Sequence, residues 1–230
     1  MKISVLGAGA WGTSISKVLA ENNKQINLFA LEEEVVNSVN RERLNNIFLK
    51  NITLPDNIIA TSSYDCFDHA DFIFITCPTQ YLRQQFEILK DTEISSETIF
   101  ILCCKGVENK TLKLPSEIFR QYFKNHEFAV LTGPTFAHEV ASEKQTAVSI
   151  VSDKMATAEK IKDIISTDYF HPHLVDDVIG SQICGGVKNV IAIACGIVRG
   201  LDSGENVKAA IITRGFREIA KINRELGGHD

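Results

Sequence analysis

The 230-residue sequence lacks the marks of several protein classes. Its 24 basic residues form no cluster and are outnumbered by 29 acidic ones, so the backbone of a nucleic acid is a disfavoured partner. No apolar run approaches the roughly 18 residues that span a bilayer, and glycines soon follow Lys2 where a signal peptide would have an apolar stretch. With 44% apolar and 23% charged residues and only five prolines, we expect a folded globular protein without membrane insertion.

Cysteine pairs with the spacing of a metal site are also missing. The six cysteines stand at 66, 77, 103, 104, 184 and 195, and none forms a C-x-x-C pair. Most lie inside apolar runs, which favours buried, reduced thiols in a cytosolic protein. The six histidines show no ligand spacing either, so metal binding is the weaker alternative and we expect no metal.

Short apolar runs alternate with helical patterns over most of the chain. The runs predict strands at 2–7, 25–30, 71–77, 98–104, 128–133 and 146–152. Helices are expected from about residue 11 and at 32–43, 81–89, 113–124, 136–143 and 154–165, and 44–63 is expected to be irregular. Strands separated by helices indicate an α/β fold with a mostly parallel, doubly wound sheet.

The composition changes near residue 178. Residues 178–198 are apolar on nearly every face, which predicts a buried helix. Residues 206–226 read as an amphipathic helix with Asn206 as its N-cap. We therefore expect an α/β domain over 1–180 and an all-helical part over 181–230.

Three glycines follow the first predicted strand, in the stretch "ISVLGAGAWGTSISKVLAE". Gly7, Gly9 and Gly12 form G-x-G-x-x-G between a buried strand and a helix, the context of a dinucleotide-binding Rossmann-type turn. The first glycine permits the tight turn, the second lets a pyrophosphate approach the backbone, and the third lets the helix pack on the strand. The alternative is a tight turn that binds nothing.

The end of the second predicted strand, "FALEEE", should lie at the adenosine ribose. Glu32 or its neighbours could accept a hydrogen bond from the 2′-hydroxyl and would repel a 2′-phosphate. The alternative is that these acids merely begin a helix. Because no basic residue stands there, NAD is more natural than NADP.

Ligands of such sheets bind beyond the carboxyl ends of the strands. "FITCPTQ" ends at Pro78, "ILCCKG" places Lys105 at a strand end, and "VLTGPTF" places Gly133 and Thr135 before a helix that Thr135 could cap. A cation and a helix start in one crevice would suit a phosphorylated substrate. The alternative for Lys105 is a solvated loop lysine.

Lys188 stands alone in "CGGVKNVIAIACG", with no other charge for several residues on either side. Burial lowers the pKa of a lysine, which makes Lys188 a candidate proton donor or acceptor. Gly185 and Gly186 would let a ligand approach the helix. The alternatives are a lysine that extends to solvent and an internal ion pair.

Taken together, the motifs resemble those of bacterial-type NAD(P)-dependent glycerol-3-phosphate dehydrogenases. The matching stretches are "GAGAWGTSIS", "CCKGVE", "LTGPTFAHEVA", "DDVIGSQICGGVKNVIAIACGI" and "NVKAAIITRGFREI". The resemblance implies reduction of dihydroxyacetone phosphate to sn-glycerol 3-phosphate, a glycerophospholipid precursor, with NAD or NADP as cofactor. It also implies a cytoplasmic location and allows a homodimer.

The resemblance also implies roles for individual residues. Lys188 matches the catalytic lysine, which exchanges a proton with the C2 oxygen. Lys105 matches a lysine that contacts cofactor and substrate. The remaining matches are Gly133 and Thr135 for substrate, and Ala10, Trp11 and Ala137 for cofactor.

The sequence departs from the family pattern at three points. Leu31 stands where the family often has a basic residue that helps to bind NADP, and Gly186 replaces an alanine. The family pattern also continues beyond residue 230, so the resemblance implies a truncated helical substrate domain over 181–230. A second interpretation is therefore a catalytically impaired protein that at most binds a dinucleotide.

Overall fold

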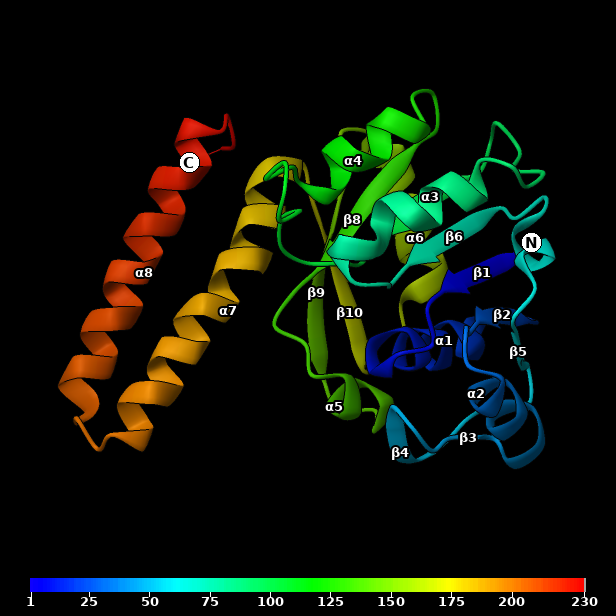
Figure 1. Ribbon diagram of the computed structural model, residues 1–230, viewed down its shortest axis with the longest axis horizontal. Coiled ribbons are helices and arrows are strands. Elements are labelled where there is room, and N and C mark those ends of the chain that lie inside the picture. The colour runs from blue at the N-terminus through cyan, green and yellow to red at the C-terminus, as the bar shows by residue number, and fades with distance from the viewer. Residues whose placement is uncertain (230) are drawn as a thin grey trace.

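An α/β unit and a projecting pair of helices make up the computed structural model, which describes residues 1–229 (Figure 1). The unit contains an eight-stranded sheet in the order β10-β9-β8-β7-β6-β1-β2-β5. Its strands are β1 (Ile3–Leu6), β2 (Ile26–Phe29), β5 (Ile58–Thr61), β6 (Phe72–Ile75), β7 (Ile99–Leu102), β8 (Phe128–Thr132), β9 (Thr146–Val151) and β10 (Phe170–Val175). Neighbouring strands are parallel except β8 and β9, which confirms the mostly parallel, doubly wound sheet.

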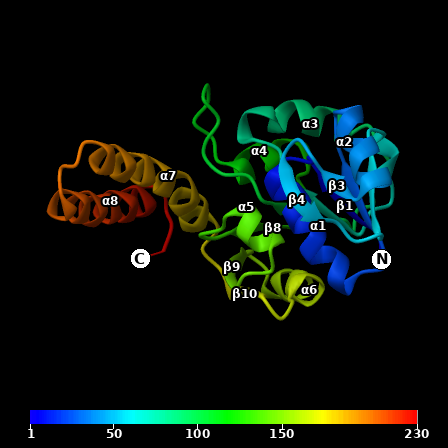
Figure 2. The same ribbon diagram turned by 90° about the horizontal axis from the view of Figure 1, so that it is seen from below.

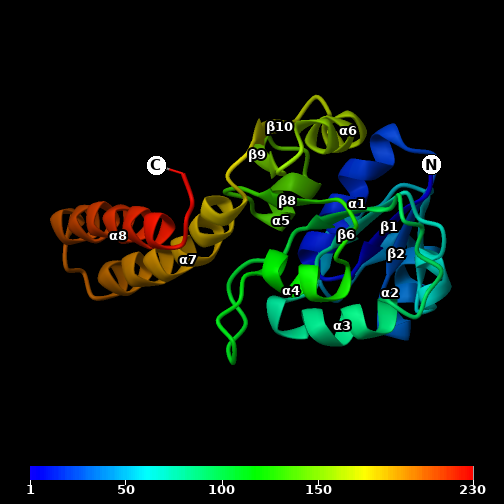
Figure 3. The same ribbon diagram turned by 90° about the horizontal axis from the view of Figure 1, so that it is seen from above.

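Helices cover both faces of the sheet, and its central strands are therefore buried on both sides. They are α1 (Ala10–Asn22), α2 (Glu33–Asn37), α3 (Leu82–Leu89), α4 (Pro115–Tyr122), α5 (Ala137–Ala141) and α6 (Met155–Ile165). Successive β7 side chains enter different cores: Ile101 joins the core that contains residues of α1 and α6, and Phe100 the core of α3 and α4. Figure 2 and Figure 3 show these two helix pairs on opposite faces.

The segment from 32 to 63 is more regular than the sequence predicts. The predicted helix at 32–43 divides into α2 and a π-helical segment, η1 (Ser38–Glu42), which ends where Arg43 takes a φ of 58°. The supposedly irregular stretch contains β3 (Leu44–Asn45), β4 (Leu49–Thr53) and β5. Asn40 explains part of the difference, since its side-chain amide hydrogen-bonds both backbone groups of Ala60. Such long-range contacts leave no periodic signal.

Other short elements were also absent from the prediction. β10 forms an outer strand of the sheet, and two 3₁₀ segments, η2 (Tyr64–Phe67) and η3 (Thr79–Tyr81), flank β6.

Cys103 and Cys104 are buried as expected, but Cys184 is exposed. Among residues 1–229 no group of three or more His, Cys, Asp or Glu side chains is placed to hold a metal ion.

The helical arm consists of α7 (Val178–Gly200) and α8 (Glu205–Glu225), which pack against each other and project beyond the sheet (Figure 1). The prediction of a helix buried on nearly every face is wrong: Val190 and Ile193 are each 65% exposed, because beyond the sheet α7 packs mainly on α8. The N-cap of α8 is Gly204 rather than Asn206. The expected domain boundary at 180/181 stays a prediction.

α7 also bears on the expectation that no apolar run is long enough to span a bilayer. Among the described residues, α7 is the one helix that is both long enough and apolar enough to cross a membrane. In its most apolar window, 28% of the helix is buried. Length and composition alone do not separate such a span from a core helix, and α7 carries Lys188 near its middle.

Candidate functional site

The glycine turn between β1 and α1 has the geometry that its three glycines predict. Gly7 has a φ of 111°, which favours glycine, and its N–H donates to the Phe29 carbonyl of β2 at 3.1 Å. A Cβ on Gly12 would lie 1.8 Å from the Gly7 carbonyl oxygen. α1 can therefore pack this closely on the turn only because residue 12 has no side chain. A Cβ on Gly9 would meet nothing within 4 Å. Gly9 therefore borders open space at the start of α1.

Three polar side chains that the sequence did not single out hold this turn. The Thr76 hydroxyl, just after β6, lies 2.9 Å from the Leu6 carbonyl oxygen and 2.8 Å from that of Gly7. The buried Asn45 amide donates to the Ala8 carbonyl at 2.8 Å and to Thr13 Oγ1 at the same distance. The partners of Thr76 and Asn45 lie more than 30 positions away in the chain, so no local pattern in the sequence predicts these contacts.

The acids at the end of β2 lie in the expected place. Glu32 precedes α2 as its N-cap residue and is exposed, but its side chain makes no capping hydrogen bond. The Glu33 carboxylate accepts a hydrogen bond from Ser62 at 2.7 Å. Both interpretations of Glu32, a ribose ligand and a helix start, remain compatible with this geometry.

Lys105 follows β7 and is half-buried rather than solvated, which contradicts the loop-lysine alternative. Its ammonium lies 5.5 Å from the centre of the Trp11 ring, and its carbonyl accepts a hydrogen bond from Thr79 at 2.7 Å. Burial lowers the pKa of Lys105, and the nearby Lys188 ammonium lowers it further. The Trp11 indole N–H is buried and has no hydrogen-bond partner among the described residues.

Lys188 reaches from α7 to the loop after β8. Its Nζ donates to the Gly133 carbonyl at 2.8 Å, and the side chain is half-buried. Burial lowers the pKa of Lys188, and no carboxylate among the described residues offsets this shift. Neither alternative, a lysine extended to solvent or an internal ion pair, describes this geometry.

Gly185 and Gly186 let α7 pack closely on the end of β8 and on the loop after β7. A Cβ on Gly185 would lie 3.0 Å from Thr132 Oγ1, and one on Gly186 would lie 3.2 Å from the Gly106 Cα. At Gly185 the end of β8 occupies the space where the sequence predicts a ligand, whereas Gly186 also borders the groove described below. Their close packing brings Lys188 to the crevice that also holds Lys105.

The stretch from Gly133 to Ala137 connects the lysines with the glycine turn. Thr135 does not cap α5, because Phe136 is the N-cap residue. The Thr135 N–H instead donates to the Gly133 carbonyl at 3.1 Å. The Ala137 carbonyl accepts a hydrogen bond from Ser14 of α1 at 2.8 Å. α5 thus adjoins α1 close to the glycines.

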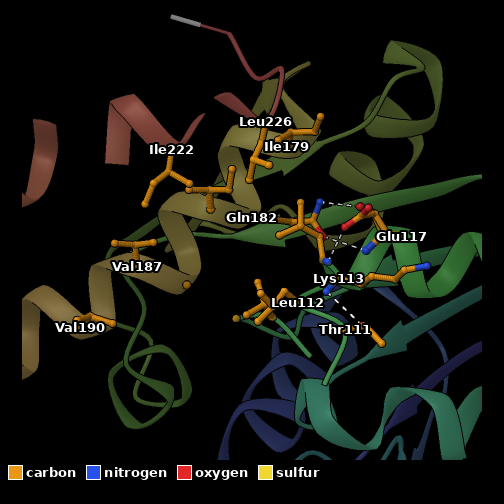
Figure 4. A pocket seen from close by; sticks show the side chains of 16 residues that line it. Thr111, Leu112, Lys113, Glu117, Ile179, Gln182, Val187, Val190, Ile222 and Leu226 are labelled. Atoms are coloured by element: carbon orange, nitrogen blue, oxygen red, sulfur yellow. Dashed lines mark hydrogen bonds between the residues drawn. The ribbon is translucent and has the colours of Figure 1, made fainter. Parts of the chain in front are cut away.

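A separate groove of about 670 Å³ lies between the arm and the loop before α4 (Figure 4). Its lining includes Ile179, Val187 and Val190 of α7, whereas Lys188 projects from the opposite side of that helix by its 100° spacing. Neither the candidate lysines nor the glycine turn line it. The groove and the candidate site therefore lie on different faces of α7.

Comparison with known proteins gives a consistent result. The model of the N-terminal part of NAD-dependent glycerol-3-phosphate dehydrogenase matches residues 2–158, and that of the C-terminal part matches residues 177–230. A glycerol-3-phosphate dehydrogenase (NAD(P)+) of Erythrobacter litoralis is 38% identical over 226 residues, which cover 98% of this chain and 67% of the relative.

Solved structures show the same likeness. Glycerol-3-phosphate dehydrogenase of Coxiella burnetii superposes with a TM-score of 0.93 at 31% identity, over 99% of this chain and 70% of that one. The enzyme of Saccharomyces cerevisiae gives 0.85 at 31% identity, over 98% of this chain and 70% of that one. The chain therefore belongs to the family of NAD-dependent glycerol-3-phosphate dehydrogenases, oxidoreductases that use NAD or NADP.

Proposed function

We propose that this chain binds NAD or NADP at the glycine turn and catalyses the reversible interconversion of dihydroxyacetone phosphate and sn-glycerol 3-phosphate. The observation that carries the proposal is a pair of half-buried lysines: Lys105 lies beside Trp11 at that turn, and Lys188 lies close to Lys105. Two ammonium groups without carboxylate partners among the described residues favour an anionic substrate.

The residues present fit a dinucleotide. The open space at Gly9 and the free N–H groups in the first turn of α1 suit a pyrophosphate, and the buried indole N–H of Trp11 in the same turn has no partner among the described residues. Gly7, Gly12, Ala10, Glu32 and Ala137 complete the proposed cofactor contacts. When bound, the nicotinamide ring supplies or accepts the hydride.

The chain's own groups then handle charge and the proton. Lys188 gives a proton to the C2 oxygen of the ketone as the alcohol forms, and takes it back in the reverse direction. Lys105 balances negative charge on cofactor and substrate. Gly133 and Thr135 contact the substrate next to Lys188, whose amine leaves the Gly133 carbonyl when it turns to the substrate oxygen.

Further parts of the proposal concern the setting. Reduction towards glycerol 3-phosphate would feed glycerophospholipid synthesis in the cytoplasm, and a homodimer is the proposed assembly. Residues 1–180 would form the dinucleotide-binding domain, and residues 181–230 would belong to the helical substrate domain.

The test measures turnover and binding separately on the 230-residue chain. Oxidation of NADH or NADPH is followed with dihydroxyacetone phosphate, and binding is followed through the fluorescence of the single tryptophan, Trp11. Turnover above background supports the proposal. Binding without turnover supports a dinucleotide-binding protein that is catalytically impaired, and absence of binding contradicts both.

A further inference from the structure

The adenosine end of the proposed cofactor site bears on the choice between NAD and NADP. β1 and β2 run parallel with Leu6 beside Phe29, and the Gly7 N–H donates to the Phe29 carbonyl at 3.1 Å. The Ala30 N–H donates to the Thr61 carbonyl at 2.9 Å, which fixes the strand end against β5. Leu31 is therefore the first residue beyond the sheet at the glycine turn, and it is 68% exposed.

The charged residues that directly follow Leu31 in the sequence are all acidic. Glu32, Glu33 and Glu34 follow directly and are exposed, and Ser62 holds the Glu33 carboxylate at 2.7 Å against the end of β5. No lysine or arginine occurs from residue 25 to residue 40. Of the next two arginines, Arg41 is exposed in the last turn of η1, and Arg43 is engaged by Asp56 at 3.1 Å and by the Ile58 carbonyl at 3.0 Å.

A 2′-phosphate needs a cation at this place, whereas a 2′-hydroxyl needs an acceptor. We infer that Leu31 and the carboxylates of Glu32 and Glu33 make this chain selective for NAD over NADP. The exposed leucine offers an apolar contact to the adenosine, and the two carboxylates repel the added phosphate. This inference rests on the proposed cofactor site and goes beyond it by stating which of the two cofactors binds more tightly.

The test compares equilibrium dissociation constants for NADH and NADPH by calorimetry, which needs no turnover. We expect the native chain to bind NADH at least about tenfold more tightly than NADPH. Raising the ionic strength should narrow this ratio, because salt screens the repulsion between exposed charges.

Two variants make the test specific. Leu31→Arg should tighten NADPH binding by about tenfold or more, through a charge-assisted hydrogen bond to the phosphate, and change NADH binding far less. Leu201→Arg is the matched control, since it adds the same charge at a leucine 72% exposed at the end of α7, and it should leave the ratio unchanged.

The outcomes separate this inference from the proposed function. Equal affinity of the native chain for both dinucleotides, or a preference for NADPH, overturns the selectivity while the cofactor site stands. Failure of both dinucleotides to bind the folded chain, with folding checked by circular dichroism, overturns the cofactor site and the selectivity with it.

Discussion

Lys188 and Lys105 place two ammonium groups at the carboxyl ends of the strands with no carboxylate near enough to offset them among the described residues. Such an arrangement destabilises the folded chain when no ligand is bound, because burial disfavours the charged form of a lysine. Substrate and cofactor phosphates would supply the missing negative charge. Substitution of either lysine should therefore affect the free energy of unfolding and the proposed activity differently, and the two effects can be measured separately.

Replacement of Lys188 by alanine should remove turnover and spare binding. We expect kcat to fall by about 10²- to 10⁴-fold, the usual contribution of a positioned acid or base. Dinucleotide affinity, read from Trp11 fluorescence, should stay close to native because Lys188 contacts the Gly133 loop and not the glycine turn. Lys160→Ala, at an exposed lysine of α6, should change neither quantity. Normal turnover by Lys188→Ala would refute the catalytic assignment.

Lys105→Met should stabilise the fold while it weakens the proposed binding of phosphate. Removing the buried cation should raise the free energy of unfolding by about 1 kcal/mol, which is roughly 2–4 °C in melting temperature for a chain of this size. The folded-state pKa of Lys105 is lowered, so its cost is full below that pKa and disappears as the pH rises to the unfolded value of 10.5. Melting curves at pH 7 and pH 10 should therefore show a smaller difference at pH 10, and an unchanged or larger one would contradict the prediction.

At the scale of elements, the glycine turn offers a matched pair of substitutions. Gly12→Ala should lower the free energy of unfolding by about 3 kcal/mol or more, since its Cβ would lie 1.8 Å from the Gly7 carbonyl oxygen. Gly9→Ala should leave stability close to native, because nothing lies within 4 Å of its Cβ. Its effect should appear in dinucleotide affinity, with a loss of about tenfold as the methyl group fills the space for the pyrophosphate.

Denaturation by urea and calorimetric binding separate the two effects. If Gly9→Ala bound NADH as tightly as the native chain, the pyrophosphate would have to approach elsewhere. A stable Gly12→Ala variant would show that α1 can move away from the turn.

The elements also show how far the sequence could predict this molecule. The turn at Gly7 and the core strands were predictable because local pattern determines them: a buried run, a positive φ and a helix start. The exposure of Val190, the π-helical break at Arg43 and the hydrogen bonds of Thr76 were not, since each depends on what lies beside the segment in space. The identity of Lys188 as an isolated charge was visible, but its carbonyl partner was not.

At the scale of the whole molecule, the arm and the sheet differ in how much of the chain surrounds them. β6 is fully buried, whereas α7 beyond Val190 has mainly α8 as its neighbour. We expect amide hydrogens in 190–216 to exchange faster than those of β1 and β6 by on the order of 100-fold or more. Hydrogen–deuterium exchange followed by mass spectrometry measures this directly. Equal protection of arm and sheet would show that the arm is covered in solution.

The anchoring of α7 at Gln182 gives the arm the geometry of a lever. Gln182 is buried and bonded to both the backbone and the hydroxyl of Ser116, at 3.0 and 2.9 Å, so it marks a fulcrum near the base of the helix. Lys188 lies only about 9 Å beyond it and Gly200 about 27 Å. A tilt of about 5° would move the tip by roughly 2.4 Å but the lysine by less than roughly 1 Å. The end of α7 at Gly200 can thus move while the Lys188 amine stays close to its place beside the Gly133 carbonyl.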